Sequence, residues 1–218
     1  MKVGTDGVLL GAWVNLNKAT TLLDVGTGTG VIALMLAQRT TSAATITAVE
    51  LEHDAFLQAV ENVALSPWPE KVVVAQSAIQ NYFPNHKFDL IVSNPPYFQN
   101  SQKPPDEKRE LSRHTVTLSF LELIEAVQRL LTDQGKFNVI LPNHEGMAFV
   151  DLAAKNNFYC SRQWAFRTRQ EKPVERWLLE FSRQPTIDKE KGEIVLYKAA
   201  DVWSDTYKSL TRAFYLKA

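Results

Sequence analysis

The motif Asn94-Pro95-Pro96-Tyr97 combines residue types that could prepare an amino nitrogen for methylation. The lone pair of an adenine amine or a carboxamide is delocalised, so this nitrogen attacks a methyl donor poorly unless acceptors hold its N–H groups. The side-chain oxygen of Asn94 and the backbone carbonyl of Pro95 are such acceptors, and the prolines restrict their directions. Tyr97 could stack on the planar group. The motif predicts amino-nitrogen methylation, with a simple strand-ending turn as the alternative.

A glycine-rich turn lies upstream of this motif, between a strand-like and a helix-like run. Gly26, Gly28 and Gly30, with Thr27 in the same turn, let the backbone pass close to a ligand and bring a helix N-terminus against it. Their G-x-G-x-G spacing differs from the G-x-G-x-x-G fingerprint of dinucleotide sites. The turn therefore favours S-adenosylmethionine over NAD as the cofactor, and it strengthens the catalytic interpretation of Asn94.

Residues at the expected strand ends complete the predicted cofactor site. Glu50, about 20 residues after the turn, is placed to accept hydrogen bonds from both ribose hydroxyls, with a solvated strand end as the alternative. Asp24 could hold the amino group of the methionine part directly or through water, or it could cap a helix. Leu51 and the pair Ser77-Ala78 are expected to flank the adenine ring, although many methyltransferases have an acidic residue near the position of Ser77.

Length and composition predict one enzyme domain over residues 1–218. The chain has 45% hydrophobic residues and no net charge, so it can bury a sizeable core but offers no bulk attraction for nucleic acid. The single cysteine, Cys160, suits a reducing cytosol, and no apolar run approaches the roughly 20 residues of a transmembrane helix. We expect a cytoplasmic monomer without membrane contact. His53, His86 and His144 show no ligand spacing, so no metal is expected.

Strand-like and helix-like runs alternate through the first two thirds of the chain. The expected strands cover residues 21–25, 45–50, 71–76, 88–93 and 136–141, and the expected helices cover residues 31–37, 53–65, 118–131 (stopped at Gly135) and 145–156. This βαβ rhythm predicts an α/β fold with a parallel, doubly wound sheet that binds its ligands at the carboxyl ends of the strands. Both motifs fall at such ends.

The later segments break this rhythm. Residues 158–167 and 176–183 are predicted strands joined by a connection too short for a helix, so they should pair antiparallel. A last strand at 193–198 and a short helix at 205–216 follow. This order is expected of a Rossmann-like class I methyltransferase with a mostly parallel seven-stranded sheet and a C-terminal antiparallel hairpin, whereas a dinucleotide dehydrogenase would have six parallel strands. Residues 99–109 are predicted to form a mobile loop beside the active centre.

The chain resembles the bacterial tRNA-Val adenine-37 N6-methyltransferases over nearly its whole length. The similarity is carried by residues 1–13, 24–30, 66–68, 94–98, 113–114 and 214–216. The glycine turn and Asn-Pro-Pro-Tyr are shared by many amino-methyltransferases. The opening segment and Arg113-His114 distinguish this family from the other amino-methyltransferases. The resemblance implies methyl transfer from S-adenosylmethionine to N6 of the adenosine next to the tRNA anticodon. Family members usually have a further N-terminal stretch, so we expect one to be missing before Met1.

Chemistry and resemblance together imply roles for the motif. Asn94 accepts a hydrogen bond from the target N6–H, the Pro95 carbonyl accepts the other, and Tyr97 stacks on the adenine. Pro96 and Phe98 line the same pocket. No strong base is required, because the attacking amine becomes acidic and water can remove its proton afterwards. Catalysis is then mainly positioning and electrostatics.

Two further pairs are assigned by their positions. Thr5 and Asp6 lie in a segment that would fold over the cofactor and could contact its methionine end, with a helix N-cap as the alternative. Arg113 and His114 follow the predicted loop and could contact phosphate, with an ordinary surface position as the alternative.

A basic stretch at residues 155–176 is the candidate RNA surface. It has six basic residues against two acidic ones, with aromatic residues between them. Arg167, Arg169 and Lys172 are the expected contacts to the tRNA backbone, although strand alternation leaves a core role for the aromatics equally open. The target base would turn out of the unpaired anticodon loop at little cost.

Three other functions remain open at this point. Methyltransferases of protein glutamine in release factors share Asn-Pro-Pro-Tyr, but they usually have a separate helical N-terminal domain, for which there is no room before Asp24. DNA adenine methylation is disfavoured because no target-recognition domain is apparent. A cofactor-binding or RNA-scaffold role without turnover would leave function intact after Asn94→Ala.

Overall fold

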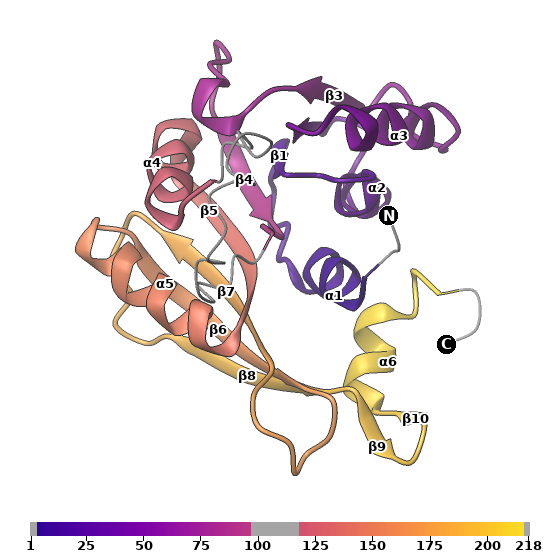
Figure 1. The fold of residues 1–218 in the computed structure, drawn as a ribbon, viewed down its shortest axis with the longest axis vertical. Coiled ribbons are helices and arrows are strands. Elements are labelled where there is room, and N and C mark those ends of the chain that lie inside the picture. Colours follow the sequence, from indigo (N-terminus) through magenta and orange to yellow (C-terminus); the bar gives the residue numbers. More distant parts are fainter. Residues whose placement is uncertain (1–3, 97–117, 216–218) are drawn as a thin grey trace, which may run out of the picture.

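An eight-stranded sheet forms the centre of the structure, a computed structural model that describes residues 4–96 and 118–215 (Figure 1). Its strand order is β3-β2-β1-β4-β5-β7-β6-β8, and a separate two-stranded sheet pairs β10 with β9. The strands are β1 (Thr21–Val25), β2 (Thr45–Glu50), β3 (Val72–Gln76), β4 (Phe88–Ser93), β5 (Leu131–Pro142), β6 (Tyr159–Arg167), β7 (Arg176–Ser182), β8 (Glu190–Val195), β9 (Tyr197–Ala199) and β10 (Val202–Trp203).

Strand directions bring the chemically interesting segments to one edge of the sheet. Neighbouring strands from β3 to β5 are parallel. Strand β7 is antiparallel to both β5 and β6, so β6 points the same way as the parallel core, and β8 is parallel to β6. The carboxyl ends of β1, β2, β4, β6 and β8 therefore lie along the same edge as the start of β7.

Helices cover both faces of the sheet. They are α1 (Thr5–Trp13), α2 (Val31–Arg39), α3 (His53–Ala64), the 3₁₀ helix η1 (Ile79–Asn81), α4 (Phe120–Leu130), α5 (Asn143–Lys155) and α6 (Asp205–Thr211). Figure 1 shows α1, α2, α3 and α6 on one side of the sheet and α4 and α5 on the other. The buried residues form a core on each side, the first containing Leu10 and Leu36 and the second containing Val127 and Phe149. The sheet is thus covered on both faces, as a parallel sheet requires.

The predicted fold class is confirmed, with differences at particular residues. Gly135 does not stop the helix before β5. Helix α4 ends at Leu130, and the buried Leu131 turns into extended backbone and pairs with Phe88, so sheet pairing and burial decide the boundary. Gly135 lies inside β5, near a register shift between Phe88 and Leu90.

The sheet has one strand more than the predicted seven. Residues 190–195 add along β6 as a parallel edge strand, and they begin before the predicted range of 193–198. The antiparallel hairpin of β6 and β7 is present as predicted. In the described ranges, none of the helices has the length and apolar character needed to cross a membrane.

Candidate functional site

A pocket of about 450 Å³ opens at the carboxyl edge of the sheet beside β1, β2 and β4. It is lined by Gly4, Gly7, Gly26, Thr27, Gly28, Thr29, Val31, Ile32, Glu50, Glu52, Ala55, Asn94, Pro95 and Pro96. The glycine turn and the described part of the Asn-Pro-Pro-Tyr motif therefore share one cavity. Its volume lies within the range of small-molecule sites, which is about 300 to 1,000 Å³.

The glycine turn adopts a backbone shape that favours glycine. Gly26, Gly28 and Gly30 have φ angles of 69°, 58° and 85°, in the left-handed region. The amides of Gly26 and Thr27 both donate to the carbonyl of Val49, at 2.9 and 3.1 Å, which ties the turn to the end of β2. Gly30 is the N-cap of α2, so the turn presents a helix N-terminus at the pocket.

Asp24 is buried directly beneath this turn. Its Oδ2 accepts hydrogen bonds from the Thr27 hydroxyl at 2.6 Å and the Ala33 amide at 3.1 Å. Its Oδ1 is buried and has no hydrogen-bond partner in the described part of the chain. Burial raises the pKa of Asp24 to about 7, with a smaller contribution from the charge of Glu50. Asp24 thus makes the predicted cap-like bond and retains an oxygen that a cation could use.

Glu50 lines the pocket with a carboxylate fixed by backbone amides. Oε2 accepts from Gly28 N at 2.8 Å, and Oε1 accepts from the amides of Leu51 and Glu52, both at 2.9 Å. A carboxylate offers about four lone-pair positions, so about one stays available for a ligand hydroxyl. The orientation of this acceptor is therefore set before any ligand binds.

The Asn94 segment is tied to the glycine turn through the strand that precedes it. Ser93 is buried at the end of β4, and its hydroxyl donates to the carbonyl of Val25 at 2.9 Å. Asn94 is half-buried, Pro95 is buried and Pro96 is exposed at the pocket. The remaining predicted residues of this region, Tyr97, Phe98, Arg113, His114 and the loop at 99–109, lie outside the described residues.

Several predicted cofactor residues lie near the pocket but do not line it. Thr5 and Asp6 are in the first turn of α1, whose N-cap is Gly4, so neither residue caps the helix. Oδ2 of Asp6 accepts a hydrogen bond from Arg176 Nε at 2.8 Å. Asp24, Gly30, Leu51, Ser77 and Ala78 are also absent from the lining, and their cofactor contacts stay predictions.

Sequence reasoning missed other residues of the lining. Glu52 caps α3, accepting from Asp54 N at 3.0 Å and Ala55 N at 2.7 Å, and these bonds lower the pKa of Glu52. The acidic residue directly before a helix was the available signal. Gly4 and Gly7 also line the pocket, and two glycines close together at the start of an apolar helix were the corresponding signal.

The candidate RNA residues lie at the end of β6 and on the loop that joins it to β7, at the same edge of the sheet. Arg167 forms an ion pair with Glu193 and donates to the Lys172 carbonyl at 2.6 Å. Arg169 donates to the carbonyl of Ala200 at 2.7 Å, and its guanidinium lies over the Tyr197 ring. The Lys172 side chain is exposed.

Most aromatic residues of the basic stretch belong to the core, and Trp164 packs against the core cluster that contains Phe166. Phe158 and Phe166 are buried, whereas Tyr159 and Trp164 are half-buried. Over residues 4–96 and 118–215, no group of three or more His, Cys, Asp or Glu side chains could hold a metal ion.

Comparison with known proteins gives a consistent pattern. The family model described as "Methyltransferase small domain" matches residues 4–158. A protein of Histophilus somni named "tRNA1(Val) (adenine(37)-N6)-methyltransferase" is 44% identical over 99% of this chain and 91% of its own length. Proteins of the same name from Parabacteroides distasonis and Aeromonas hydrophila are 42% and 45% identical, over 100% of this chain and 92% and 91% of their own lengths.

Solved structures share the fold at low sequence identity. A predicted O-methyltransferase from Agrobacterium tumefaciens superposes with a TM-score of 0.75 at 16% identity, over 95% of this chain and 96% of the other. A glycopeptide N-methyltransferase complexed with S-adenosyl-L-methionine superposes with a TM-score of 0.59 at 13% identity, over 84% of this chain and 100% of the other. These structures support the fold alone.

The left-handed conformation at Gly26 predicts a specific effect of a methyl group there. Gly26→Ala should lower the free energy of unfolding by about 1 to 2 kcal/mol, because only the backbone conformation is strained and a Cβ would meet no atom within 4 Å. Gly4→Ala is the matched control, since Gly4 has a φ of −90° and similar open space. Urea unfolding measures both, and equal stability of the two variants would contradict the role given to the turn.

Proposed function

Since the chain belongs to the family of tRNA1(Val) (adenine(37)-N6)-methyltransferases, we propose that it transfers a methyl group from S-adenosylmethionine to N6 of adenosine 37 in this tRNA. The observation that carries the proposal is the single pocket that holds both the glycine turn and Asn94-Pro95-Pro96. Cofactor and acceptor amine can meet there because the two segments follow neighbouring strands.

The residues of the pocket fit this cofactor. One ribose hydroxyl finds an oriented acceptor in Glu50, which three backbone amides hold in place. Asp24 lies beneath the turn and not in the lining, and its buried, unpartnered Oδ1 would hold the amino group of the methionine part directly or through water. Gly26 and Gly28 carry no side chains, so the cofactor can lie close to the backbone of the turn at these two positions. When bound, S-adenosylmethionine supplies an electrophilic methyl group on a positively charged sulfur.

The acceptor side of the pocket positions the amine. Asn94 Oδ1 and the Pro95 carbonyl accept hydrogen bonds from the two N6–H groups, which directs the nitrogen lone pair at the methyl group. The same oxygens stabilise the positive charge that develops on N6 during attack. Water then takes one N6 proton, so no strong base is needed. Tyr97 and Phe98 are proposed to stack on the base and line its site with Pro96.

The loop between β6 and β7 is the proposed contact to the tRNA backbone. It lies at the same edge of the sheet as the pocket, and it carries Arg169 and the exposed Lys172. Arg167 is paired with Glu193 and contributes less free charge. Arg113 and His114 are proposed to contact phosphate as well. We propose further that the protein acts on the anticodon loop as a monomer in the cytoplasm and that it needs no metal.

The test is transfer of labelled methyl from S-adenosylmethionine to unmodified total tRNA, a release factor and adenine-containing duplex DNA in parallel. Nucleosides from the RNA are identified by mass. The expected product is N6-methyladenosine in tRNA alone. Label in the release factor would show that Asn94 positions a protein glutamine instead of an adenosine. Label in the DNA would show that the substrate is DNA and not tRNA.

Asn94→Ala should remove nearly all methyl transfer while keeping cofactor binding. Loss of one acceptor for the reacting amine should lower kcat by about 100-fold or more, as for other single groups that stabilise developing charge. The dissociation constant of the cofactor, measured by calorimetry, should stay within about twofold. Asn85→Ala, at an exposed asparagine outside the pocket, is the control. Unchanged turnover in Asn94→Ala would contradict the catalytic role proposed for Asn94.

Cofactor affinity should depend on pH through Asp24. A carboxylate holds an ammonium group only when ionised, and the pKa of Asp24 is raised to about 7. The affinity should therefore rise about tenfold per pH unit below pH 7 and level off above it, with release of a proton on binding. Calorimetry in buffers of different ionisation enthalpy measures both effects. Asp24→Asn should flatten the profile, and a flat profile in the unsubstituted protein would contradict this role.

Lys172→Gln should weaken tRNA binding in a salt-dependent manner. Removing one phosphate contact should reduce the slope of log affinity against log salt by about one. Filter binding at several salt concentrations measures this slope. Lys87→Gln, at an exposed lysine next to the amino end of β4, should leave the slope unchanged. If Lys172→Gln and Lys87→Gln gave the same slope, the tRNA backbone would not contact Lys172.

A further inference from the structure

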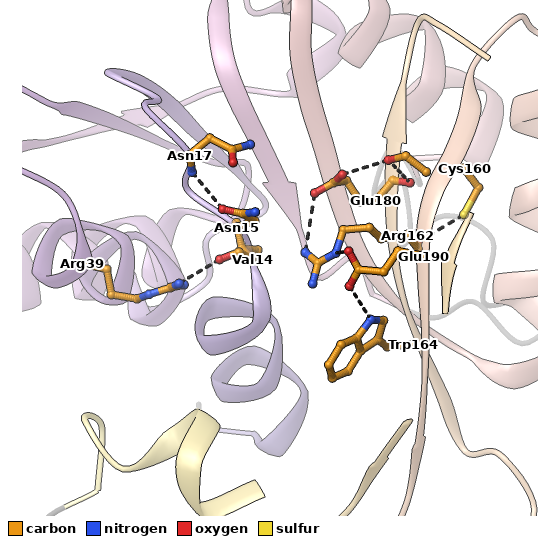
Figure 2. Close-up of polar contacts among 10 residues, drawn as sticks. Val14, Asn15, Asn17, Arg39, Cys160, Arg162, Trp164, Glu180 and Glu190 are labelled. Carbon is orange, nitrogen blue, oxygen red and sulfur yellow. Dashed lines mark hydrogen bonds and ion pairs between the residues drawn. The ribbon is translucent and has the colours of Figure 1, made fainter. Parts of the chain in front are cut away.

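Helix α1 forms one side of the cofactor pocket and is anchored at its C-terminal end. Gly4 and Gly7, at its start, line the pocket. At its other end, Arg39 of α2 donates to the carbonyl of Val14 at 2.8 Å (Figure 2). The guanidinium of Arg162 lies 4.2 Å from the centre of the Trp13 ring, so strand β6 also holds this end.

The anchor residue Arg162 is itself held by the hairpin of β6 and β7. Arg162 Nη1 lies 3.7 Å from Glu180 Oε2, and Arg162 Nε lies 3.1 Å from Glu190 Oε2. Figure 2 shows the two carboxylates beside the guanidinium. Glu180 also accepts from the Ser161 hydroxyl at 2.8 Å, and Glu190 accepts from Trp164 Nε1 at 3.0 Å. The C-terminal end of α1 is therefore fixed against the sheet.

The N-terminal end of α1 is joined to the same hairpin by an ion pair. Asp6 Oδ2 lies 2.8 Å from Arg176 Nε, and both side chains are partly buried, with 21% and 31% exposed. Arg176 opens β7, where it pairs with Pro142 of β5 and Phe166 of β6. Partial burial strengthens such a contact compared with one in water.

Arg176 directly follows the loop that carries the candidate RNA residues and contacts its last residue. Its Nη1 donates to the carbonyl of Glu175 at 2.9 Å. The Glu175 carboxylate accepts from the amide and hydroxyl of Thr168, at 2.9 and 2.6 Å, which closes the loop across its base. The same guanidinium therefore contacts both the RNA-facing loop and the first turn of α1.

We propose that the Asp6–Arg176 pair is a positioning pair that couples RNA binding at residues 168–175 to cofactor binding beside Gly4 and Gly7. This inference rests on the proposed function, because it takes tRNA as the partner of the loop. RNA that binds the loop restrains Arg176 further, and through Asp6 it restrains the first turn of α1. The cofactor then binds to a wall that is already ordered, so less conformational entropy is lost.

Such coupling must be reciprocal, which makes it measurable. The probes are sinefungin, an analogue with no methyl group to transfer, and an unmodified tRNA transcript. In the unsubstituted protein, saturating tRNA should lower the dissociation constant of sinefungin by about fivefold or more, and sinefungin should strengthen tRNA binding by the same factor. In Asp6→Asn and in Arg176→Gln this factor should fall to about one.

Steady-state kinetics and a charge-swapped double variant distinguish a positioning role of the Asp6–Arg176 pair from a merely structural role. In Asp6→Asn, KM for S-adenosylmethionine at saturating tRNA should rise, while kcat stays within about twofold because Asn94 and Pro95 are untouched. The charge-swapped double variant Asp6→Arg with Arg176→Asp should recover part of the coupling factor. A structural defect would instead lower Tm and kcat together, without rescue.

Arg183→Gln is the matched control at the opposite end of β7. Arg183 contacts Asp133 and the carbonyls of Gln128 and Leu131, far along the strand from Arg176. This variant should keep the full coupling factor even if its Tm falls. Full coupling in both Asp6→Asn and Arg176→Gln, or tRNA methylation without coupling in the unsubstituted protein, would overturn the inference. Failure to bind or methylate any tRNA would instead overturn the proposed function.

Discussion

The parallel pairing of β1 with β4 is the constraint on which the site depends. Val25 and Ser93, the last residues of these strands, are register partners, and the Ser93 hydroxyl donates to the Val25 carbonyl. The segments that follow them, the glycine turn and Asn94-Pro95-Pro96, must therefore leave the sheet side by side. A one-residue slip of this register would turn the side chains of one strand to the other face and separate the two halves of the pocket.

Two carboxylates beside the glycine turn are set to different tasks by their surroundings. Glu50 is held by three backbone amides and faces the pocket, so it is an oriented acceptor. Asp24 is buried, and its raised pKa lets it gain or lose a proton near neutral pH. In the proposed complex, Glu50 accepts from the cofactor ribose and Asp24 accepts from its ammonium group. Helix α1 completes the wall, held at both ends by arginines of the hairpin that contacts RNA in the proposed complex.

Local patterns predicted the sheet, the hairpin and the two motifs because glycine spacing, strand alternation and proline restriction act over a few residues. They did not predict what long-range packing decides. Gly135 was a reasonable helix stop, but burial of Leu131 against β4 moved the boundary. Glu52 had a local signal as an acidic residue directly before a helix, but its place in the pocket depends on how α3 packs. The Asp6–Arg176 pair joins residues far apart in the chain, so local spacing does not predict it.

A crystal structure of the protein with sinefungin and the unmodified anticodon stem-loop would test the central claim, that one pocket brings the adenosine amine to the methyl donor. The account predicts that the adenine of nucleotide 37 is turned out of its stack, with N6 at about 3 Å from both Asn94 Oδ1 and the Pro95 carbonyl oxygen. Sinefungin should contact Glu50 and the glycine turn. An adenine that stays stacked, or that lies away from Asn94 while sinefungin occupies the pocket, would contradict it.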